Sequence, residues 1–378
     1  MVCSRPLSRR TTSSRDPPRA AGGRCAISSS VSSKSKSEVF ISKQPSASGN
    51  GCRLAVQQDV FDVIIIGGGP AGLSAALVLA RCRRTLLLCD NGHPRNARSS
   101  ALHGFLSRDC ISPLELLRLG REDLKPYGVE PRETTVTHLL HVADRFEATL
   151  QDGEKVRARM ALIASGVRDD LPDVPGLSDC YGVTVHHCPY CDGWEHRDKA
   201  IAVIGRGTSG AGLALSLKTW TSRVVLCTNG ARAIRREDRV RLEEEHIVIR
   251  STPISRIDHD GPSVRSVVFR DGSTAPCDSV FFSDRQNQQC DLAARLGCEM
   301  NRHGVVKTDH LGQTHIPGLF VAGDASRDVQ FAIVAAAEGA KAAVAINKAL
   351  QRRAGLAVAP QDSESDARAS ARADTTRA

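Results

Sequence analysis

Aromatic side chains are scarce in this chain of 378 residues, at 4% of its composition. Proteins that bind nucleic acid use such side chains as stacking platforms for bases, so this class is disfavoured. Cysteine is too scattered for a secreted disulfide scaffold, because the 13 residues are an odd number spread along the chain. Glycine shows no three-residue period, which excludes a collagen-like chain. We therefore expect a protein of a reducing compartment that binds no nucleic acid.

Long uncharged runs are also rare. Residues 63–80 form one run of eighteen residues without a charge, which is about the minimum length for a membrane-spanning helix. The segment Gly67-Gly68-Gly69-Pro70 divides this run into a short β-branched part and a helical part. The sequence therefore predicts no membrane span.

The net charge of +9 lies almost entirely at one end of the chain. Residues 1–58 contain ten Lys or Arg, two acids and fourteen Ser, whereas basic and acidic groups nearly balance in the remainder. Such a segment cannot bury enough apolar surface to fold, so we expect disorder in 1–58 and in the polar tail 353–378. The composition of 1–58 is typical of an organellar transit peptide, with a nonspecific tail as the alternative. We expect a cytoplasmic protein, or one of the plastid or mitochondrial matrix if 1–58 is a transit peptide.

The first ordered unit has the pattern of a dinucleotide-binding fold. Residues 62–66 predict a buried parallel strand, and Gly67, Gly69 and Gly72 follow in G-x-G-x-x-G spacing. A helix to residue 81 and a strand over 85–89 come next, and Asp90 ends that strand. In this fingerprint the glycines permit a tight turn, approach to a pyrophosphate and helix packing, and the acid accepts hydrogen bonds from a ribose. A plain packing turn is the alternative.

A second copy of this unit follows. It consists of a strand over 200–204, Gly205, Gly207 and Gly210, a helix to about residue 220 and a strand over 223–227. Thr228, which is not acidic, takes the place that Asp90 has in the first copy. Between the copies, residues 112–115 (Ser-Pro-Leu-Glu) have capping-box spacing and predict a helix start. Two nucleotide sites in one chain imply electron transfer between two cofactors.

The pair Cys188 and Cys191 lies just before the second copy. This spacing brings both sulfurs to one side of a helical first turn, where a thiolate is stabilised. The pair can alternate between dithiol and disulfide, and the adjacent Asp192 can deliver or remove a proton. Zinc is the alternative, because three histidines lie close in sequence: His186, His187 and His196. A structural zinc site normally has a second CxxC, which the sequence lacks, so we expect no metal.

These motifs, in this order, resemble the low-molecular-weight, bacterial-type thioredoxin reductases, which are FAD-dependent pyridine nucleotide-disulfide oxidoreductases. The resemblance covers about 59–350. The first glycine fingerprint matches the FAD motif of that family, and Ala164-Ser165-Gly166 matches the motif where the chain leaves the flavin domain. Cys188-Pro-Tyr-Cys-Asp192 matches the redox motif, and Gly318–Asp324 matches the late flavin motif, whose aspartate holds the ribityl–pyrophosphate region of FAD.

The resemblance implies an α/β fold of two nested Rossmann-like, three-layer ββα dinucleotide-binding domains, the second inserted in the first. The FAD-binding domain would comprise 59–172 and 289–352, and the pyridine-nucleotide and redox-disulfide domain 173–288. The residues implied to bind FAD are Gly67, Gly69, Pro70, Ala71, Gly72, Asp90, Asn96, Ala164, Ser165, Gly166, Gly323, Asp324, Gln330 and Phe331. Those implied to bind the pyridine nucleotide are Gly205, Gly207, Thr208, Ser209 and Gly210.

The resemblance also implies a route for electrons from NADPH or NADH through FAD to the Cys188–Cys191 disulfide, and from there to a substrate. As in the family, Cys191 would lie against the flavin, Cys188 would attack the partner and Asp192 would be the acid–base group. Two crossings of the chain, near 171–176 and 282–288, would act as hinges between two domain orientations. The partner would be a thioredoxin-like protein or a small disulfide or dithiol, and the protein a homodimer.

Two departures from the family pattern leave the reaction open. Family members that use NADPH carry His-Arg-Arg where this chain has Thr228-Asn229-Gly230, so the 2′-phosphate loses its bidentate partners. Three nearby arginines are candidate replacements: Arg232, Arg235 and Arg236. The usual acidic reader of NAD is missing too. In addition, Gly193-Trp194-Glu195 resembles the dithiol oxidases of this fold, which pass electrons from a small dithiol through FAD to oxygen. A non-catalytic flavin sensor is a third alternative, against which the cysteine pair argues.

Overall fold

The computed structural model describes residues 60–231, 234–283, 286–301, 303–326 and 329–356. The predicted disordered leader 1–58, Arg232 and most of the predicted tail 353–378 lie outside these ranges. Within the described part, no helix combines the length and the apolar character that crossing a membrane requires.

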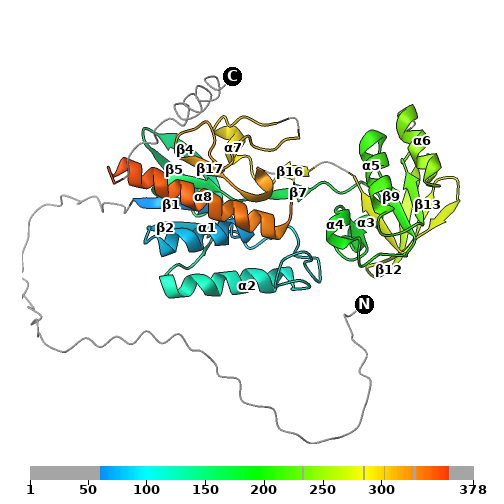
Figure 1. The fold of residues 1–378 in the computed structure, drawn as a ribbon, viewed down its shortest axis with the longest axis horizontal. Helices are drawn as coiled ribbons and strands as arrows, with labels where there is room; N and C mark the ends of the chain where they lie inside the picture. Colours follow the sequence, from blue (N-terminus) through cyan, green and yellow to red (C-terminus); the bar gives the residue numbers. More distant parts are fainter. Residues whose placement is uncertain (1–59, 232–233, 284–285, 302, 327–328, 357–378) are drawn as a thin grey trace, which may run out of the picture. The chain divides into compact units, whose positions relative to one another are not determined.

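The first sheet has seven strands within the described residues (Figure 1). Their order is β3-β2-β1-β6-β5-β4, and β17 pairs with β6. The strands are β1 (Phe61–Ile66), β2 (Leu86–Asp90), β3 (Arg132–Glu133), β4 (Val136–Val142), β5 (Arg145–Leu150), β6 (Lys155–Ile163) and β17 (Leu319–Val321). The long strand β6 pairs with the antiparallel β5 along its first half and with the parallel β17 along its second half. Because β17 follows the second domain along the chain, the second domain is inserted between strands of this sheet.

Three helices cover one face of the first sheet: α1 (Pro70–Arg81), α2 (Pro113–Leu124) and α8 (Ala332–Arg353). Their Leu and Ala side chains are buried together with Val63 and Ile65 of β1. Helices α1 and α8 lie side by side (Figure 1), so close that a Cβ on Gly339 would lie 2.0 Å from the Ala71 carbonyl oxygen. Ile64 of β1 points to the other face, where residues of the antiparallel strands β4 and β5 bury it. Burial of β1 on both faces therefore explains why this strand reads as an unbroken apolar run.

Helix α2 begins at the residue that the capping-box spacing predicts, but the side-chain hydrogen bond of a capping box is not formed. Ser112 is the N-cap and Pro113 the first helical residue, yet the Ser112 hydroxyl makes no capping hydrogen bond. A 3₁₀ turn, η1 (Lys125–Tyr127), continues the chain beyond the helix. The fixed φ of Pro113 and the extended backbone of Ser112 are thus enough to start this helix.

The second domain has a five-stranded parallel sheet within the described residues, in the order β11-β10-β9-β15-β8. Its strands are β8 (Val185–His186), β9 (Ile201–Ile204), β10 (Val224–Cys227), β11 (Val248–Arg250) and β15 (Ser279–Phe282). Helices α5 (Gly207–Leu217) and α6 (Arg236–Glu244) bury residues against one face. The antiparallel strands β12 (Ile254–Asp260), β13 (Ser263–Phe269) and β14 (Thr274–Pro276) cover the other face. This arrangement repeats the three-layer plan of the first domain.

Two crossings connect the domains and are hydrogen-bonded to each other. β7 (Val167–Asp169) and β16 (Gln286–Gln288) form an antiparallel pair. The short helix α3 (Leu177–Cys180) precedes the second sheet, and α4 (Pro189–Asp192) lies between its strands β8 and β9. After the sheet come α7 (Leu292–Arg295) and the 3₁₀ turn η2 (Gly323–Ala325). The topology confirms the predicted α/β class, with the second Rossmann-like domain inserted in the first. The boundaries 172/173 and 288/289 stay predictions, as do the hinges near 171–176 and 282–288, of which 284–285 lie outside the described residues.

Candidate functional site

The cysteine pair lies at the start of the one-turn helix α4. Cys188 is its N-cap in extended backbone, and Pro189 takes the first helical position, which its fixed φ favours. The cysteines are joined as a disulfide, with their Cα atoms 5.3 Å apart. The backbone N–H of Cys191 donates to the Cys188 sulfur over 3.2 Å, so a thiolate at Cys188 would meet a donor. The sulfurs are bonded to each other, which suits a redox pair and not a set of zinc ligands.

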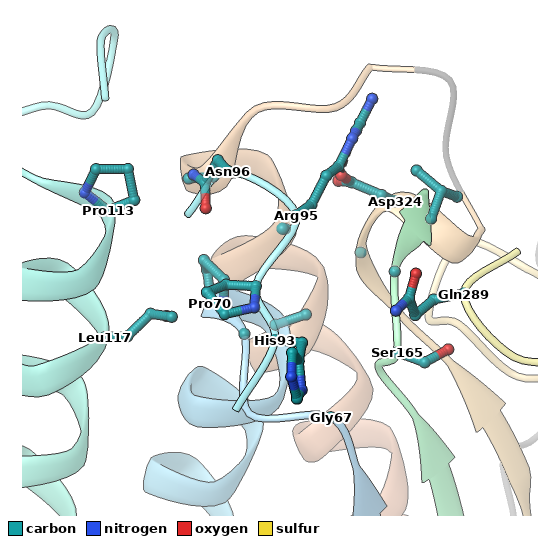
Figure 2. A pocket seen from close by; sticks show the side chains of 18 of the residues that line it. Gly67, Pro70, His93, Arg95, Asn96, Pro113, Leu117, Ser165, Gln289 and Asp324 are labelled. Atoms are coloured by element: carbon teal, nitrogen blue, oxygen red, sulfur yellow. Dashed lines mark hydrogen bonds and ion pairs between the residues drawn. The ribbon is translucent and has the colours of Figure 1, made fainter. Parts of the chain in front are cut away.

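A cavity opens where the carboxyl ends of β1, β2 and β6 meet, the usual ligand position in such sheets (Figure 2). Figure 2 shows Gly67 and Pro70 at the start of α1, with Ser165 and Gln289 to their right in the view. The predicted FAD-binding residues that line the cavity are Gly67, Gly69, Pro70, Ala71, Asp90, Asn96, Ala164, Ser165, Gly166, Gly323, Asp324, Gln330 and Phe331. Cys191 and Asp192 line the same cavity, whereas Cys188 is not among its lining residues.

The start of α1 fits the pyrophosphate of a dinucleotide. A Cβ on Gly69 would meet no atom within 4 Å, so this position opens into free space. Gly69 is the N-cap of α1, and no side chain caps the helix, which leaves its first backbone N–H groups for an anion. Gly72, by contrast, does not line the cavity: its Cβ would lie 1.8 Å from the Gly67 carbonyl oxygen. Gly72 therefore serves close packing, and Gly69 leaves room for a ligand, as the fingerprint requires.

Asp90 ends β2 beside this glycine loop. A Cβ on Gly68 would lie 2.4 Å from Asp90 Oδ2, so the loop passes directly over the carboxylate. The Arg121 guanidinium donates to Oδ2 over 2.7 Å, and the Gly92 N–H donates to Oδ1 over 3.4 Å. The carboxylate is therefore held at the cavity wall, where it can accept hydrogen bonds from a ribose.

Arg95 is a hub that the sequence motifs did not reveal. Its Nη1 donates to Asp324 Oδ2 over 3.0 Å and to Gln330 Oε1 over 2.7 Å, and Figure 2 shows Arg95 beside Asp324. Its Nη2 also lies 2.9 Å from His187 Nε2. These partners are 92 to 235 positions away in sequence, so no local pattern indicates them. Arg95 thus holds the predicted flavin residues Asp324 and Gln330 in place.

Asp169, at the end of the first crossing, is the strongest partner of Arg95. It accepts from Arg95 Nε over 2.8 Å and from Nη2 over 2.5 Å, and it accepts from the Tyr181 hydroxyl over 2.6 Å. Burial opposes its ionisation, but the Arg95 hydrogen bonds and nearby positive charge outweigh burial and lower the pKa of Asp169 from 3.8 to about 2. For Asp324, burial outweighs the attraction of Arg95 and raises the pKa. Two carboxylates that share one guanidinium are therefore pushed in opposite directions.

Behind the cysteine pair, three groups form a chain. Asp192 Oδ1 lies 3.2 Å from His186 Nδ1, and His186 Nε2 lies 2.9 Å from His196 Nε2. Both histidines are 5% exposed. Burial lowers the pKa of His196 to about 3. Burial opposes ionisation of Asp192, but its contact with His186 outweighs burial and lowers the pKa of the carboxyl.

The second glycine loop has the geometry of a nucleotide site without its usual ribose reader. A Cβ on Gly210 would lie 2.4 Å from the Gly205 carbonyl carbon, which is the close packing that the third glycine permits. Thr208 and Ser209 are exposed at the uncapped start of α5, next to Gly207. The buried Thr228 hydroxyl donates to the Ala231 carbonyl over 2.5 Å.

The candidate arginines beyond this loop lie at the start of α6. Arg235 is the N-cap of this helix and Arg236 its first residue, and both are exposed. Arg232, the third candidate, lies outside the described residues. Neither described arginine makes a contact that would fix it over a bound nucleotide, so their predicted role stays a prediction.

One group of metal-ligating residues was not foreseen from the sequence. The donor atoms of His103, Asp109 and Cys110 lie within 4.8 Å of one another in the loop between β2 and α2. His103 lines the cavity, whereas the other two are exposed, and Glu195 lies 3.6 Å from His103 Nε2. We assign no metal to this group, since exposed polar clusters of this kind form without one.

Known proteins are similar to this chain in sequence and in fold. A family model described as pyridine nucleotide-disulphide oxidoreductase matches residues 61–339. A protein of Arthroderma benhamiae named "Probable thioredoxin reductase" is 30% identical over 338 residues, covering 80% of this chain and 83% of the relative. The crystal structure of HlmI has a TM-score of 0.75 at 34% identity and covers 83% of this chain and 97% of its own. An oxidoreductase from Agrobacterium tumefaciens has a TM-score of 0.72 at 32% identity, with 77% and 99% covered.

Proposed function

Because the chain belongs to the pyridine nucleotide-disulphide oxidoreductase family and is a thioredoxin-reductase-like flavin oxidoreductase, we propose that it passes electrons between FAD and a disulfide substrate through the Cys188–Cys191 pair. One observation supports this most. Cys191 lines the cavity that the predicted FAD-binding residues also line, so a flavin held by them and the disulfide would share one cavity. A structural disulfide has no need of that position.

The two sulfurs have different roles in this proposal. Cys191 borders the cavity and is the sulfur that exchanges electrons with the cofactor, whereas Cys188 is outside the cavity lining and is the sulfur that attacks the substrate. Asp192 borders the cavity next to Cys191 and exchanges the proton. In the reducing direction, two electrons enter and the S–S bond breaks, and uptake of one proton leaves one thiol and one thiolate.

FAD would bind along α1 and supply two-electron chemistry when bound. The uncapped start of α1 at Gly69 would hold the pyrophosphate, and Asp90 would hold a ribose. Asp324, kept in place by Arg95, would hold the part of the cofactor between pyrophosphate and flavin. The cavity residues therefore offer groups for the pyrophosphate, for a ribose and for the part of this cofactor next to the flavin ring.

NADPH or NADH would donate electrons from the second glycine loop. Gly205, Gly207 and Gly210, with Thr208 and Ser209, would hold its pyrophosphate at the start of α5. The Thr228 hydroxyl already donates to a backbone carbonyl, and the side chain carries no charge, so Thr228 would favour neither coenzyme. We therefore expect weak discrimination between NADPH and NADH.

The substrate would be a thioredoxin-like protein or a small disulfide. Tyr190, between the two cysteines, is 70% exposed, and Trp194 is 64% exposed with the Arg197 guanidinium 4.2 Å from its ring centre. Exposed aromatic side chains beside a reactive disulfide offer apolar contact area to a docking partner.

A second candidate function is that of an FAD-dependent dithiol oxidase, in which a small dithiol donates the electrons and oxygen accepts them. The observation in its favour is the ribose end of the second nucleotide site, where Thr228 replaces both the acidic and the basic readers. In that case the same cysteine pair would be reduced by the substrate, which leaves as a disulfide.

The two candidates differ in what reduces the flavin. The purified FAD-loaded protein is mixed without oxygen with NADPH, NADH or dithiothreitol, and the loss of flavin absorbance is followed in time. Rapid loss with either nucleotide, followed by reduction of added thioredoxin or of an aromatic disulfide, supports the reductase. Loss only with dithiothreitol, with oxygen restoring the colour, supports the oxidase. No loss with any of the three would contradict both.

A further inference from the structure

Building on the proposed function, we propose that His186 and His196 extend Asp192 into a buried proton relay that stores the proton exchanged by the Cys188–Cys191 pair. The relay starts at the cavity, since Asp192 lines it together with Cys191. From there it runs inward, over 3.2 Å from Asp192 Oδ1 to His186 Nδ1 and over 2.9 Å between the two imidazole Nε2 atoms.

A backbone carbonyl sets the position of the first proton. His186 Nε2 lies 3.1 Å from the Val183 oxygen as well as 2.9 Å from His196 Nε2. A carbonyl only accepts hydrogen bonds, so the proton must be on His186 Nε2 and is shared between the two acceptors. His196 Nε2 is then an acceptor, and the proton of that neutral ring is on Nδ1, a buried atom without a partner among the described residues.

A second proton must lie between His186 and Asp192. With Nε2 already protonated, Nδ1 of a neutral His186 would carry a lone pair towards the carboxylate oxygen 3.2 Å away. Such a contact between two acceptors is unfavourable, so one proton belongs to this contact, on Nδ1 or on Oδ1. The Asp192–His186 contact is therefore a store for a single proton beside the redox sulfurs.

Little of the store reaches solvent, although His186 lines the cavity as Asp192 does. His186 and His196 are each 5% exposed, and the Phe281 ring packs on both, with centroids 5.4 and 6.0 Å away. The Asp192 side chain is 21% exposed at the cavity. Asp192 is therefore the most exposed group of the relay and the main route by which its proton is exchanged.

Other charged groups face the relay from the packed elements around it. His187 acts electrostatically on Asp192, and Lys199 and Asp278 act on His196. Asp192 in turn acts on Tyr181, whose hydroxyl donates to Asp169. Arg95 acts on His187 and lies beyond it. None of these groups makes the short contact that Asp192 has with His186.

The chemistry balances in both directions. When the disulfide is reduced by two electrons from the reduced flavin, the S–S bond breaks, one sulfur takes the stored proton and the other stays a thiolate. A solvent proton that enters through Asp192 refills the store. When a dithiol is oxidised, its sulfur loses a proton to the emptied Asp192–His186 contact as the S–S bond forms and two electrons pass to the oxidised flavin.

The test uses the FAD-loaded protein and compares His186→Asn, Asp192→Asn and the double variant. Asn places an amide N–H where Nδ1 was, so His186→Asn keeps a hydrogen bond to Asp192 but cannot transfer a proton. We expect each single variant to slow disulfide or dithiol turnover by about 100-fold or more, and the double variant to be no slower than Asp192→Asn. Effects that multiply in the double variant would overturn the relay.

A second readout does not need turnover. In the reduced protein, the rate of alkylation of Cys188 by iodoacetamide is measured against pH. His186→Asn leaves the Asp192 carboxylate without its proton, so the midpoint moves to higher pH, whereas Asp192→Asn does not raise it. An unchanged midpoint in His186→Asn would overturn the proposal. If the wild type turns over neither disulfides nor dithiols, the proposed function fails, and this readout still tests the relay.

Two further variants complete the design. His196→Gln keeps an acceptor for the His186 N–H, so its turnover rate should stay within a few-fold of wild type. His196→Leu has no acceptor, so its turnover should be slowed nearly as much as in His186→Asn. Equal loss in both would remove His196 from it. His246→Asn, at an exposed position after α6, is the matched control and should behave as wild type.

Discussion

Arg95 and Asp169 form a bidentate ion pair, with Nη2 2.5 Å from Oδ1 and Nε 2.8 Å from Oδ2. The pair joins the loop after β2 to the first crossing between the domains, and the Asp169 side chain is only 4% exposed. The same guanidinium reaches Asp324 and Gln330 of the first domain and His187 of the inserted domain. One side chain thus links residues of the cavity, the first crossing and the residue before the cysteine pair.

Replacing this hub should destabilise the protein. Arg95→Ala leaves the Asp169 carboxylate buried without its partner, which typically costs about 3–5 kcal/mol. We expect a lower midpoint of thermal unfolding and a lower flavin content, and Arg95→Lys should rescue little because a lysine cannot form the fork. The matched control is Arg118→Ala, which removes an exposed bidentate pair with Glu115 and should change the midpoint little. Equal effects of the two alanine variants would contradict this role of Arg95.

The same pair predicts a dependence of stability on pH. The pKa of Asp169 is lowered to about 2 in the folded protein from 3.8, so its ionised form stabilises the fold. That contribution, about 2 kcal/mol, is complete above the unfolded value and is lost as pH falls from about 4 through 2. The difference in unfolding midpoint between wild type and Asp169→Asn should therefore be largest at pH 6 and shrink towards pH 2. A difference that grows as pH falls would show the opposite sign and refute the assignment.

The redox pair should be separable from cofactor binding. Cys188→Ser or Cys191→Ser should abolish turnover of disulfides and dithiols, because the S–S bond can no longer form, while the flavin stays bound. Turnover and the ratio of flavin to protein absorbance are measured on the same samples. Cys82→Ser, at an exposed free cysteine after α1, is the control and should retain both. Undiminished turnover in the two active-site variants would take the pair out of the reaction.

Substitutions of Gly69 and Gly72 in the first loop should have different effects, one on flavin binding and the other on folding. In Gly69→Ala the new methyl enters free space, so folding should persist while flavin binding falls, because that space is where the pyrophosphate would lie. In Gly72→Ala the methyl would lie 1.8 Å from the Gly67 carbonyl oxygen, so the strand–helix packing itself should break. Circular dichroism and flavin content distinguish the two results. A colourless but folded Gly72→Ala protein would reverse this assignment.

Local sequence patterns were sufficient for the features whose causes are local. The apolar strand before Gly67, the glycine spacing and the CxxC turn each depend on neighbouring residues, and the structure has them where they were expected. The helix predicted to reach about 220 ends at Leu217, because the chain there closes into turns in which Trp220 and Thr221 donate to Leu217. Element ends of this kind depend on a few hydrogen bonds that composition does not encode.

The long-range polar contacts could not be predicted from the sequence. Arg95 meets Asp324 across 229 positions and Asp169 across 74, and nothing near any of the three in sequence indicates the others. The neighbouring Asn96 was assigned to the flavin site instead, and it does line the cavity. Predicting the hub requires knowing that the first crossing, the loop after β2 and the start of α8 converge, which only the folded topology provides.

The antiparallel ribbon of β7 and β16 has a mechanical consequence. Because the two crossings are hydrogen-bonded to each other, neither can rotate without the other. A rotation of the inserted domain relative to the first must therefore twist both strands together, as a single two-stranded unit.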